Sequence, residues 1–346
     1  MGARSARRLA PILVAIAALE GCCAYSAPRY EGAPSDHFDG ARFRTPGARG
    51  LDGAALSRWI LTRKPGAWRA WVDDPPGPPP PARVADGAIR VTFVNHATLL
   101  VQMDGVNVLT DPVWSDRVGP EPWIGPRRHR APGVRFSDLP KIDAVVVSHN
   151  HYDHLDLPTL ARLSEAHRPQ VVAGLGNHLL IEGAGVDRAV DLDWWQEVEI
   201  GPNVRVIAVP AQHGSMRGLC DRDATLWAGF VISGPSGRVF FAGDTGYGPH
   251  FAAIRRRLGP MRLALLPIGA FRPQEVLAPV HMSPADAVRA HHDLGASTSV
   301  AMHFGTFAQA DDGEIEPVVE LERALGAEPS RARFWVLDHG LGRWVP

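Results

Sequence analysis

Cysteine, clustered basic charge and long apolar runs are all scarce in this chain, and each scarcity excludes a class of protein. Cys22, Cys23 and Cys220 are the only cysteines among 346 residues, too few for a disulfide framework or a thiolate metal site. The formal net charge is −1, and no block of basic residues is long enough to indicate a nucleic-acid partner. The apolar run from Leu9 to Leu19 is too short to cross a bilayer, because a spanning helix needs about 20 such residues.

Apolar residues and turn-forming residues are both plentiful. Hydrophobic residues make up 45% of the chain, enough to bury a substantial core in one large domain or two. The 35 glycines and 31 prolines predict many loops and turns rather than long helices. We expect three segments: a leader over 1–22, a linker and N-terminal extension over 23–87, and a catalytic domain over 88–346. The oligomeric state stays open, a homodimer included.

The first 22 residues have the composition of an export signal. Arg4, Arg7 and Arg8 precede the apolar run Leu9–Leu19, which is the charge order of a secretory leader. Leu19-Glu20-Gly21-Cys22 then resembles the lipobox of bacterial lipoproteins, although Glu20 stands where a small residue is usual. We therefore expect a protein of the cell envelope, either membrane-anchored through Cys22 or periplasmic, with a membrane surface as partner. An ordinary N-terminal helix is the alternative.

The extension that follows has three different compositions. Residues 24–50 are rich in Gly, Pro, Arg and Asp without periodicity, which predicts a linker. Residues 51–72 carry several tryptophans and leucines among basic residues, which is typical of a helix packed on a domain or of one lying at a membrane surface. Residues 75–81 are nearly all proline and predict a stiff, extended spacer.

The remaining sequence predicts an alternation of strand-rich and helical stretches. The turn at Asp104-Gly105 is a strong hairpin signal. Two sheets packed face to face with helices outside would accommodate this order in one domain. The predicted helices are 158–167, 177–182, 251–258, 284–293 and 317–325, and the predicted strands are 89–93, 98–103, 106–109, 145–147, 171–173, 197–200, 204–209, 225–232, 238–242, 263–267, 299–302 and 334–337.

Four potential metal ligands lie within six residues, directly after a buried strand. The run Val145–Val147 leads into His149, His151, Asp153 and His154. In an extended chain the first three alternate and project from one side, whereas His154 breaks the alternation and can face a second point. Imidazole and carboxylate are common zinc ligands. The spacing therefore indicates two adjacent metal ions better than one, and a merely polar loop is the alternative.

Three further ligand candidates each follow a predicted strand. They are His213 after 204–209, Asp244 within a glycine-flanked turn after 238–242, and His303 after 299–302. Ligands in α/β architectures gather where strands emerge from the core. Any one of them alone would be an ordinary loop residue, but together with the histidine cluster they predict a shared metal centre.

These motifs resemble those of the metallo-β-lactamase superfamily of binuclear hydrolases. The order of His149, His151, Asp153, His154, His213, Asp244 and His303 matches its ligand pattern. The resemblance spans about residues 88–340 and implies a four-layer αββα sandwich of two mixed β-sheets with helices outside. More narrowly, the chain is similar to the branch of zinc phospholipases D that hydrolyse N-acylphosphatidylethanolamine. The stretches that carry this likeness are Asn95–Thr98, Leu109–Pro112, Ser148–Asp156, Asp193–Trp195, Phe240–Tyr247, Pro267–Ala270 and His303–Phe307.

The resemblance implies two Zn²⁺ per chain and a role for each ligand. Asp244 would bridge the two ions, and a hydroxide between them would attack the phosphorus of the substrate. Positions matching Tyr152 and His281 contact the substrate in this branch, where His281 can also protonate the leaving alkoxide. Packing is the alternative for Tyr152, and His96 is expected beside the ligands rather than among them. The terminal ligands would divide into His149, His151 and His213 for one ion and Asp153, His154 and His303 for the other.

The expected activity is hydrolysis of N-acylphosphatidylethanolamine or a related phospholipid to phosphatidic acid and the head-group alcohol. Asp244, Asp153 and His281 are the expected catalytic residues. Hydrolysis of a lactone or β-lactam by the same metal pair is the nearest alternative. A protein with one purely structural zinc is less consistent with the sequence, since structural zinc has a closed shell of four ligands. The loop carrying Trp114 and Trp123 could supply part of an apolar approach for lipid, and packing on the domain is the alternative for these two side chains.

Overall fold

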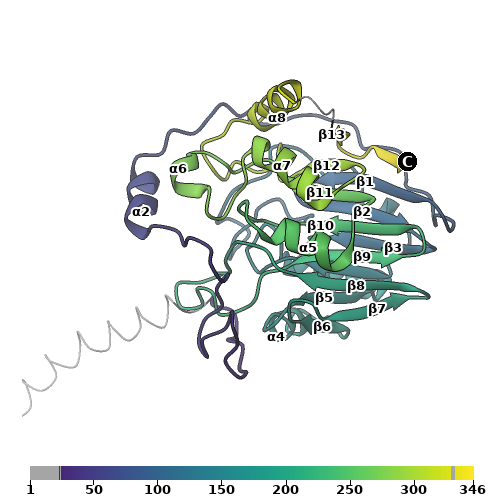
Figure 1. Cartoon of the computed structure of the whole chain (residues 1–346), viewed down its shortest axis with the longest axis horizontal. Coiled ribbons are helices and arrows are strands. Elements are labelled where there is room, and N and C mark those ends of the chain that lie inside the picture. The colour runs from purple at the N-terminus through teal and green to yellow at the C-terminus, as the bar shows by residue number, and fades with distance from the viewer. Residues whose placement is uncertain (1–22, 24, 329–331) are drawn as a thin grey trace, which may run out of the picture.

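Two seven-stranded β-sheets packed face to face form the centre of the molecule (Figure 1). The computed structural model describes residue 23 and residues 25–328 and 332–346. Within these residues the strand orders are β14-β1-β2-β3-β4-β5-β6 and β13-β12-β11-β10-β9-β8-β7. Both sheets mix parallel and antiparallel neighbours, as the sequence predicts.

The first sheet begins with an antiparallel meander and continues as a parallel unit. Asp104 and Gly105 have φ values of 48° and 75°, which suits a tight hairpin between β2 and β3. From β3 onward the strands pair in parallel. The strands are β1 (Ile89–Asn95), β2 (Thr98–Met103), β3 (Val106–Thr110), β4 (Ala144–Val147), β5 (Gln170–Gly174), β6 (Ala189–Leu192) and β14 (Gly342–Val345).

The second sheet repeats this plan. Strands β7 to β10 are antiparallel neighbours, and β10 to β13 are parallel. All five residues of β11 and all four of β12 are buried, as expected for strands covered on both faces. The strands are β7 (Glu197–Gly201), β8 (Val204–Val209), β9 (Gly229–Gly234), β10 (Gly237–Phe241), β11 (Leu263–Pro267), β12 (Ser299–Met302) and β13 (Phe334–Trp335).

Helices cover the outer faces, and the largest apolar cluster lies between the sheets. Phe93 of β1 and Phe230 of β9 belong to that cluster and are fully buried. Helices α5 and α7 lie over the second sheet in Figure 1. A capping box at Ser283 begins α7 and Gly295 ends it in the left-handed conformation. The helices are α2 (Gly53–Leu61), α3 (Leu157–His167), α4 (His178–Glu182), α5 (His250–Leu258), α6 (Gln274–Leu277), α7 (Pro284–Leu294) and α8 (Glu316–Gly326), with a 3₁₀ turn η1 (Phe136–Asp138).

Most predicted elements are present, and the differences are one strand that starts later than predicted and a few short elements that were not predicted. The strand predicted over 225–232 begins only at Gly229, because residues 225–228 are buried as loop. Strands β6 and β14 and helix α6 were not predicted. The two strands lie at sheet edges and are short, so only one neighbouring strand constrains their residue pattern.

The linker predicted over residues 24–50 is wrong, because this segment packs on the domain. The side chains of Phe38 and Phe43 are 1% and 3% exposed and join an apolar cluster with Trp227. A disulfide joins Cys23 to Cys220 across 197 residues of sequence. Single aromatic residues in irregular backbone attach this segment to the domain. Because they follow no helical or strand periodicity, the sequence pattern did not predict the packing.

Helix α2 packs on the domain. This was one of the two possibilities that the sequence left open, the other being a helix at a membrane surface. Trp59 lies against the apolar cluster of α6, and its indole N–H donates to Asp311 at 2.9 Å. Figure 1 shows α2 beside α6, at the end of the molecule opposite the C-terminus. The leader over 1–22, Cys22 included, lies outside the described residues. None of the described helices is long and apolar enough to cross a membrane.

Phe38→Ala tests whether the extension belongs to the folded unit. We expect the substitution to lower the free energy of unfolding by about 3–5 kcal/mol, because it leaves a cavity in a closed aromatic cluster. Ile60→Ala is the control from the same extension: its side chain is 58% exposed, so the change should stay within about 0.5 kcal/mol. Urea unfolding with the disulfide intact measures both. A segment that is only a linker would give no difference between them.

Candidate metal centre

The C-terminal ends of six strands meet at one edge of the sandwich and bring the candidate ligands together. His96 follows β1, Asp111 follows β3, and the stretch His149–His154 follows β4. His213, Asp244 and His303 come after β8, β10 and β12 of the other sheet. Parallel strands place their carboxyl ends on one side of a sheet, where ligands gather. Packing the two sheets face to face therefore closes the site from both sides.

Three histidines form the first ligand cluster. Nε2 of His149 lies 2.8 Å from Nδ1 of His151, which lies 3.3 Å from Nε2 of His213. The other ring nitrogen of His213 donates to the carbonyl of Val280 at 2.9 Å, which fixes the tautomer with Nε2 free to accept a metal. These three ring nitrogens are the atoms that could hold one ion.

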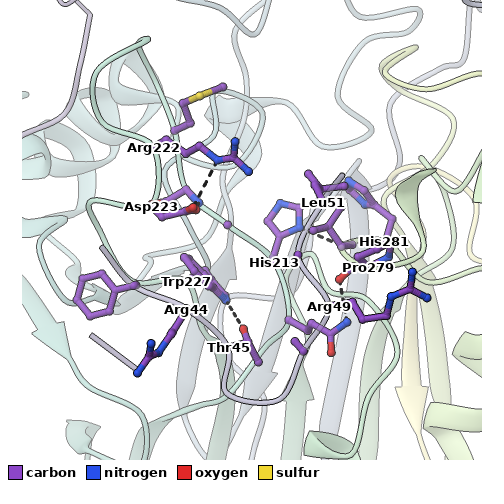
Figure 2. Close-up of a pocket in the computed structure, with 18 of the residues that line it drawn as sticks. Arg44, Thr45, Arg49, Leu51, His213, Arg222, Asp223, Trp227, Pro279 and His281 are labelled. Atoms are coloured by element: carbon purple, nitrogen blue, oxygen red, sulfur yellow. Dashed lines mark hydrogen bonds and ion pairs between the residues drawn. The ribbon is translucent and has the colours of Figure 1, made fainter. Parts of the chain in front are cut away.

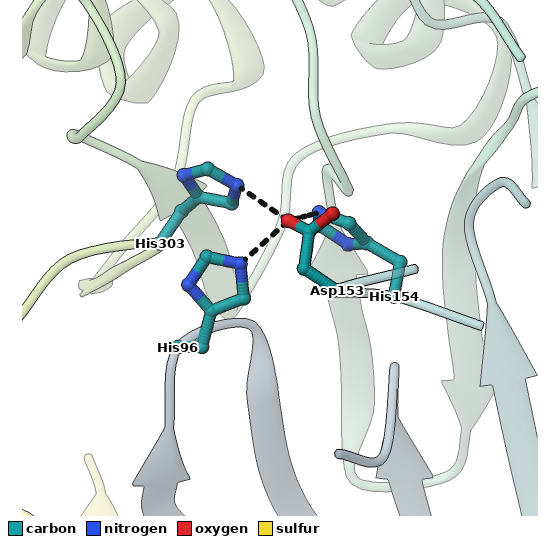
Figure 3. A group of neighbouring side chains, drawn as sticks. All are labelled: His96, Asp153, His154 and His303. Atoms are coloured by element: carbon teal, nitrogen blue, oxygen red, sulfur yellow. Dashed lines mark hydrogen bonds and ion pairs between the residues drawn. The ribbon is translucent and has the colours of Figure 1, made fainter. Parts of the chain in front are cut away.

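The second cluster gathers around the carboxylate of Asp153 (Figure 3). Its Oδ2 lies 2.9 Å from Nε2 of His96, 2.9 Å from Nε2 of His154 and 3.6 Å from Nε2 of His303. His96 and His303 have positive φ angles of 47° and 61°, an uncommon backbone conformation that turns both rings inward. The structure thus places a carboxylate among three imidazoles.

Asp244 lies between the two clusters. Its Oδ2 is 3.0 Å from Nε2 of His303 and 3.2 Å from Nε2 of His154 in the second cluster, and 3.9 Å from Nε2 of His213 in the first. Gly243, with φ of 59°, makes the turn that brings the carboxylate here, and a Cβ at that position would meet the side chain of Ser148 at 2.4 Å. The carboxylate is therefore placed where one group could serve two ions.

The electrostatics of the cluster favour bound cations. Burial, with the nearby His213, lowers the pKa of His151 to about 3, so this imidazole is neutral at pH 7 as a metal ligand must be. Burial alone would raise the pKa of Asp244, but positive charge at His154 and His303 lowers it well below the usual range. Burial by itself would lower the pKa of His303. The nearby carboxylates, of which Asp244 contributes most, together have the larger effect and raise that pKa to about 9. The buried carboxylates thus stabilise positive charge in this site. Protons on the histidines or bound metal ions can supply that charge.

Buried polar atoms without partners show that the residues fit metal ions. Nε2 of His154, Nε2 of His303 and Oδ1 of Asp244 are inaccessible to solvent and make no well-oriented hydrogen bond with any described residue, although both ring nitrogens lie within 3.2 Å of Oδ2 of Asp244. An unpaired buried polar atom is costly and rare in folded proteins. Here such atoms come from the second cluster and from Asp244 beside it, and they are nitrogen and carboxylate oxygen, the donor set of zinc and related metals. We conclude that this is a metal-binding site.

Asp111 is a residue of the site to which sequence reasoning assigned no role. Its fully buried carboxylate accepts from Nδ1 of His154 at 2.6 Å and from the hydroxyl of Ser148 at 2.6 Å. A carboxylate behind a histidine orients the ring and raises its basicity toward a metal. Its role could have been predicted from the sequence, because Asp111 directly follows β3, and β3 is the parallel neighbour of the ligand-bearing strand β4. His96 contacts Asp153 in the same supporting way, and its predicted place beside the ligands stays a prediction.

A cavity of about 720 Å³ opens beside the first cluster (Figure 2). His151, His213 and His281 form one wall, and residues 43–51 of the N-terminal extension form another. A smaller cavity of about 170 Å³ reaches Asp153 and Asp244 and shares His151 and His281 with it. The larger volume suits a drug-sized or lipid-like ligand. Residues 43–51 were not expected to contribute to the site.

The two predicted substrate contacts take different positions. Nδ1 of His281 lies 3.9 Å from Oδ2 of Asp244, is buried without a partner, and its ring lines both cavities. Burial lowers the pKa of His281 to about 3. The hydroxyl of Tyr152 instead donates to the carbonyl of Arg217 at 3.1 Å, and its ring packs against a small apolar cluster. A substrate contact by either residue stays a prediction.

Comparison with known proteins agrees with this architecture. A family model described as a beta-lactamase superfamily domain matches residues 106–304. An uncharacterized protein of Mycobacterium tuberculosis is 42% identical over 276 residues, which cover 78% of this chain and 73% of that protein. N-acyl-phosphatidylethanolamine-hydrolyzing phospholipase D 1 of Caenorhabditis elegans is 36% identical over 255 residues, which cover 70% of this chain and 71% of that protein.

Among solved structures, a metallo-beta-lactamase fold protein of Bacillus subtilis has a similar fold. The match has a TM-score of 0.53 at 14% sequence identity and covers 74% of this chain and 99% of that one. It supports the sandwich fold and nothing finer. The matched family model, the relatives and the fold together show that this chain belongs to the metallo-β-lactamase superfamily and is a metal-dependent hydrolase of that fold.

Proposed function

We propose that this protein is a zinc-dependent phosphodiesterase of the phospholipase D type, acting on N-acylphosphatidylethanolamine or a closely related phospholipid. The observation that carries the proposal is a buried carboxylate, Asp244, which lies between two ligand clusters and lines the smaller cavity beside the large one. The activity named for the Caenorhabditis elegans relative supports the choice of substrate. Leu51, Met216 and Leu277 line the cavity and offer an apolar surface for acyl chains.

Two zinc ions would be held by the clusters already described. His149, His151 and His213 would hold one, with Asp244 shared. Asp153, His154 and His303 would hold the other, and Asp111 and His96 would orient these ligands. When bound, a zinc pair lowers the pKa of water toward 7 and stabilises negative charge on a phosphoryl group.

The chain's own residues would position the phosphodiester and handle the leaving group. A new bond forms from the water oxygen to phosphorus, and the bond from phosphorus to the head-group oxygen breaks. The head-group alkoxide then takes up a proton and leaves as the N-acylated alcohol, while phosphatidic acid remains. Nδ1 of His281 lies 3.9 Å from Oδ2 of Asp244, and the ring lines both cavities. Its neutral N–H can therefore donate a hydrogen bond to a phosphate oxygen, or to the leaving oxygen as that oxygen takes up its proton.

Hydrolysis of a lactone or another acyl compound is the second candidate. The same ligand clusters could activate water toward a carbonyl carbon, and the superfamily membership alone does not separate the two reactions. What favours the phospholipid is the cavity of about 720 Å³, which exceeds the needs of a small lactone, together with the named relative.

Asp244→Asn should cost more activity than His213→Gln at saturating zinc. The first change removes a negative charge that faces both clusters, whereas water can partly replace one terminal histidine. We expect kcat/KM to fall by about a thousandfold or more for Asp244→Asn, equivalent to several kcal/mol of lost charge stabilisation. Initial rates on a water-soluble phosphodiester, with metal content measured in the same samples, provide the comparison. Equal losses of activity in the two variants would contradict the proposed bridging role of Asp244.

Hydrolysis in ¹⁸O-labelled water should place the label on phosphatidic acid. Attack at phosphorus transfers the solvent oxygen to that product, whereas attack at a carbonyl carbon would label a released fatty acid. Mass spectrometry of the products from N-acylphosphatidylethanolamine in mixed micelles distinguishes the two. Zinc-loaded protein that leaves this lipid intact but opens a lactone would assign the function to the second candidate.

We also propose that the protein works at the cell envelope, anchored by lipid on Cys22. The apolar run Leu9–Leu19 ahead of Cys22 motivates this, and the disulfide between Cys23 and Cys220 suits an oxidising compartment. Cells fed a radiolabelled fatty acid should label the protein, and Cys22→Ser should abolish the label. Cys220→Ser, which removes a thiol outside the leader, should retain it. An unlabelled protein with Met1 still in place would contradict the anchor.

A further inference from the structure

Five large apolar side chains are exposed beside the entry to the cavity. Trp123 and Leu219 are 72% and 74% exposed, and Tyr25, Ile124 and Met216 are each more than two-fifths exposed. They come from the start of the described chain, the loop 119–125 and the loop 215–222. We refer to these five residues as the apolar rim. Single exposed apolar residues are common, but a group of this size on neighbouring loops marks an interaction site.

Covalent and polar contacts bring the three segments of the apolar rim together. The disulfide joins Cys23 to Cys220, next in sequence to Leu219. The hydroxyl of Tyr25 donates to Oε1 of Glu121 at 2.9 Å, two residues from Trp123. The guanidinium of Arg29 donates to the carbonyl of Cys220 at 2.6 Å. Residues 23–29 therefore hold both loops side by side.

The apolar rim is continuous with the metal centre. Met216 and Arg222 of its second loop line the large cavity. Between them, the guanidinium of Arg217 lies 3.9 Å from the ring centroid of Tyr152 and donates to the carbonyl of Asn150 at 2.9 Å. Both Tyr152 and Asn150 belong to the stretch that carries the ligands of the first cluster. A molecule resting on the apolar rim is thus at the mouth of the active site.

Two observations indicate what covers this surface. The leader with its apolar run Leu9–Leu19 joins the described chain at Cys23, whose disulfide partner Cys220 is next in sequence to Leu219 of the apolar rim. The exposed arginines Arg29, Arg127 and Arg222 lie on these segments or within two residues of them. Amphipathic aromatic side chains prefer the boundary between lipid and water, and nearby arginines attract anionic headgroups.

We propose that the apolar rim docks on an anionic phospholipid bilayer and holds the cavity mouth against it. Trp123, Ile124 and Leu219 enter the interfacial layer, and the arginines contact the headgroups. The docking concerns binding alone, so it stands or falls independently of the proposed hydrolysis. This docking is also distinct from the proposed lipid anchor on Cys22. The anchor would tether the chain to the membrane, whereas the docking determines which face of the domain contacts the lipid.

A fluorescent label placed on the apolar rim tests the docking in the full-length chain. The background is Cys22→Ser, which leaves Cys23 and Cys220 in their disulfide. Trp123→Cys carries an environment-sensitive dye, and Trp344→Cys is the matched control: Trp344 is 57% exposed on β14, paired with Arg90 at the end of β1 away from the metal centre. Vesicles of phosphatidylcholine and phosphatidylglycerol are the probe, and bound zinc in each labelled protein checks the fold.

We expect the dye at position 123 to shift to the blue on these vesicles and the dye at position 344 to stay unchanged. Vesicles of phosphatidylcholine alone should give a smaller shift, and an equal shift would contradict the role given to the arginines. Vesicle-bound protein with position 123 still in water would overturn the proposal. So would a blue shift without lipid together with a doubled mass in light scattering, because the apolar rim would then be an interface between two copies of the chain.

Loss of the apolar rim should also weaken binding. On the same Cys22→Ser background, Trp123→Ser with Leu219→Ser should lower the vesicle partition coefficient by about tenfold or more, since two large apolar side chains no longer enter the lipid. Trp344→Ser with Leu341→Ser removes exposed apolar side chains elsewhere and should change it less than about twofold. Equal losses in both pairs would contradict a specific docking face.

Discussion

The rest of the structure depends on the confinement of many ionisable side chains in one buried space. One oxygen of Asp244 lies within 3.9 Å of ring nitrogens from His154, His213, His281 and His303. Burying charge without a partner is very costly, and like-charged imidazoles cannot all be protonated together. Metal ions resolve this conflict, because they turn the same nitrogens and oxygens into ligands. The need to place these side chains to within fractions of an ångström explains why they sit at strand ends.

The sandwich provides that precision by dividing the ligands between two sheets. Strands β4, β8, β10 and β12 each place candidate ligands just after their carboxyl ends. Supporting contacts then fix individual rings, as Asp111 does for His154 and the carbonyl of Val280 does for His213. Sites built on regular elements with such support are more precise than sites built on loops alone. The loops are free to form the cavity, the apolar rim and the contacts to the N-terminal extension.

Much of this could be predicted from the sequence, and the gaps have physical causes. The strands next to the ligands are apolar runs with sharp polar ends, and both their positions and the αββα fold are confirmed. The ligand candidates were recognisable because imidazoles and carboxylates at those ends leave few alternatives. Residues 43–51 were missed as a wall of the cavity, since their contacts, such as Thr45 donating to the carbonyl of Ala211 at 3.0 Å, connect positions 166 residues apart. Local composition cannot predict contacts between residues so far apart in sequence. The disulfide between Cys23 and Cys220 was missed for the same reason.

The central claim is that this chain builds a site for two adjacent metal ions, and diffraction at the zinc absorption edge tests it most directly. Crystals of the zinc-loaded protein should give two anomalous peaks about 3.5–4 Å apart. One peak should lie among His149, His151 and His213, and the other beside Asp153, His154 and His303, with Asp244 contacting both. A single peak, or a second ion coordinated away from Asp244, would contradict the account.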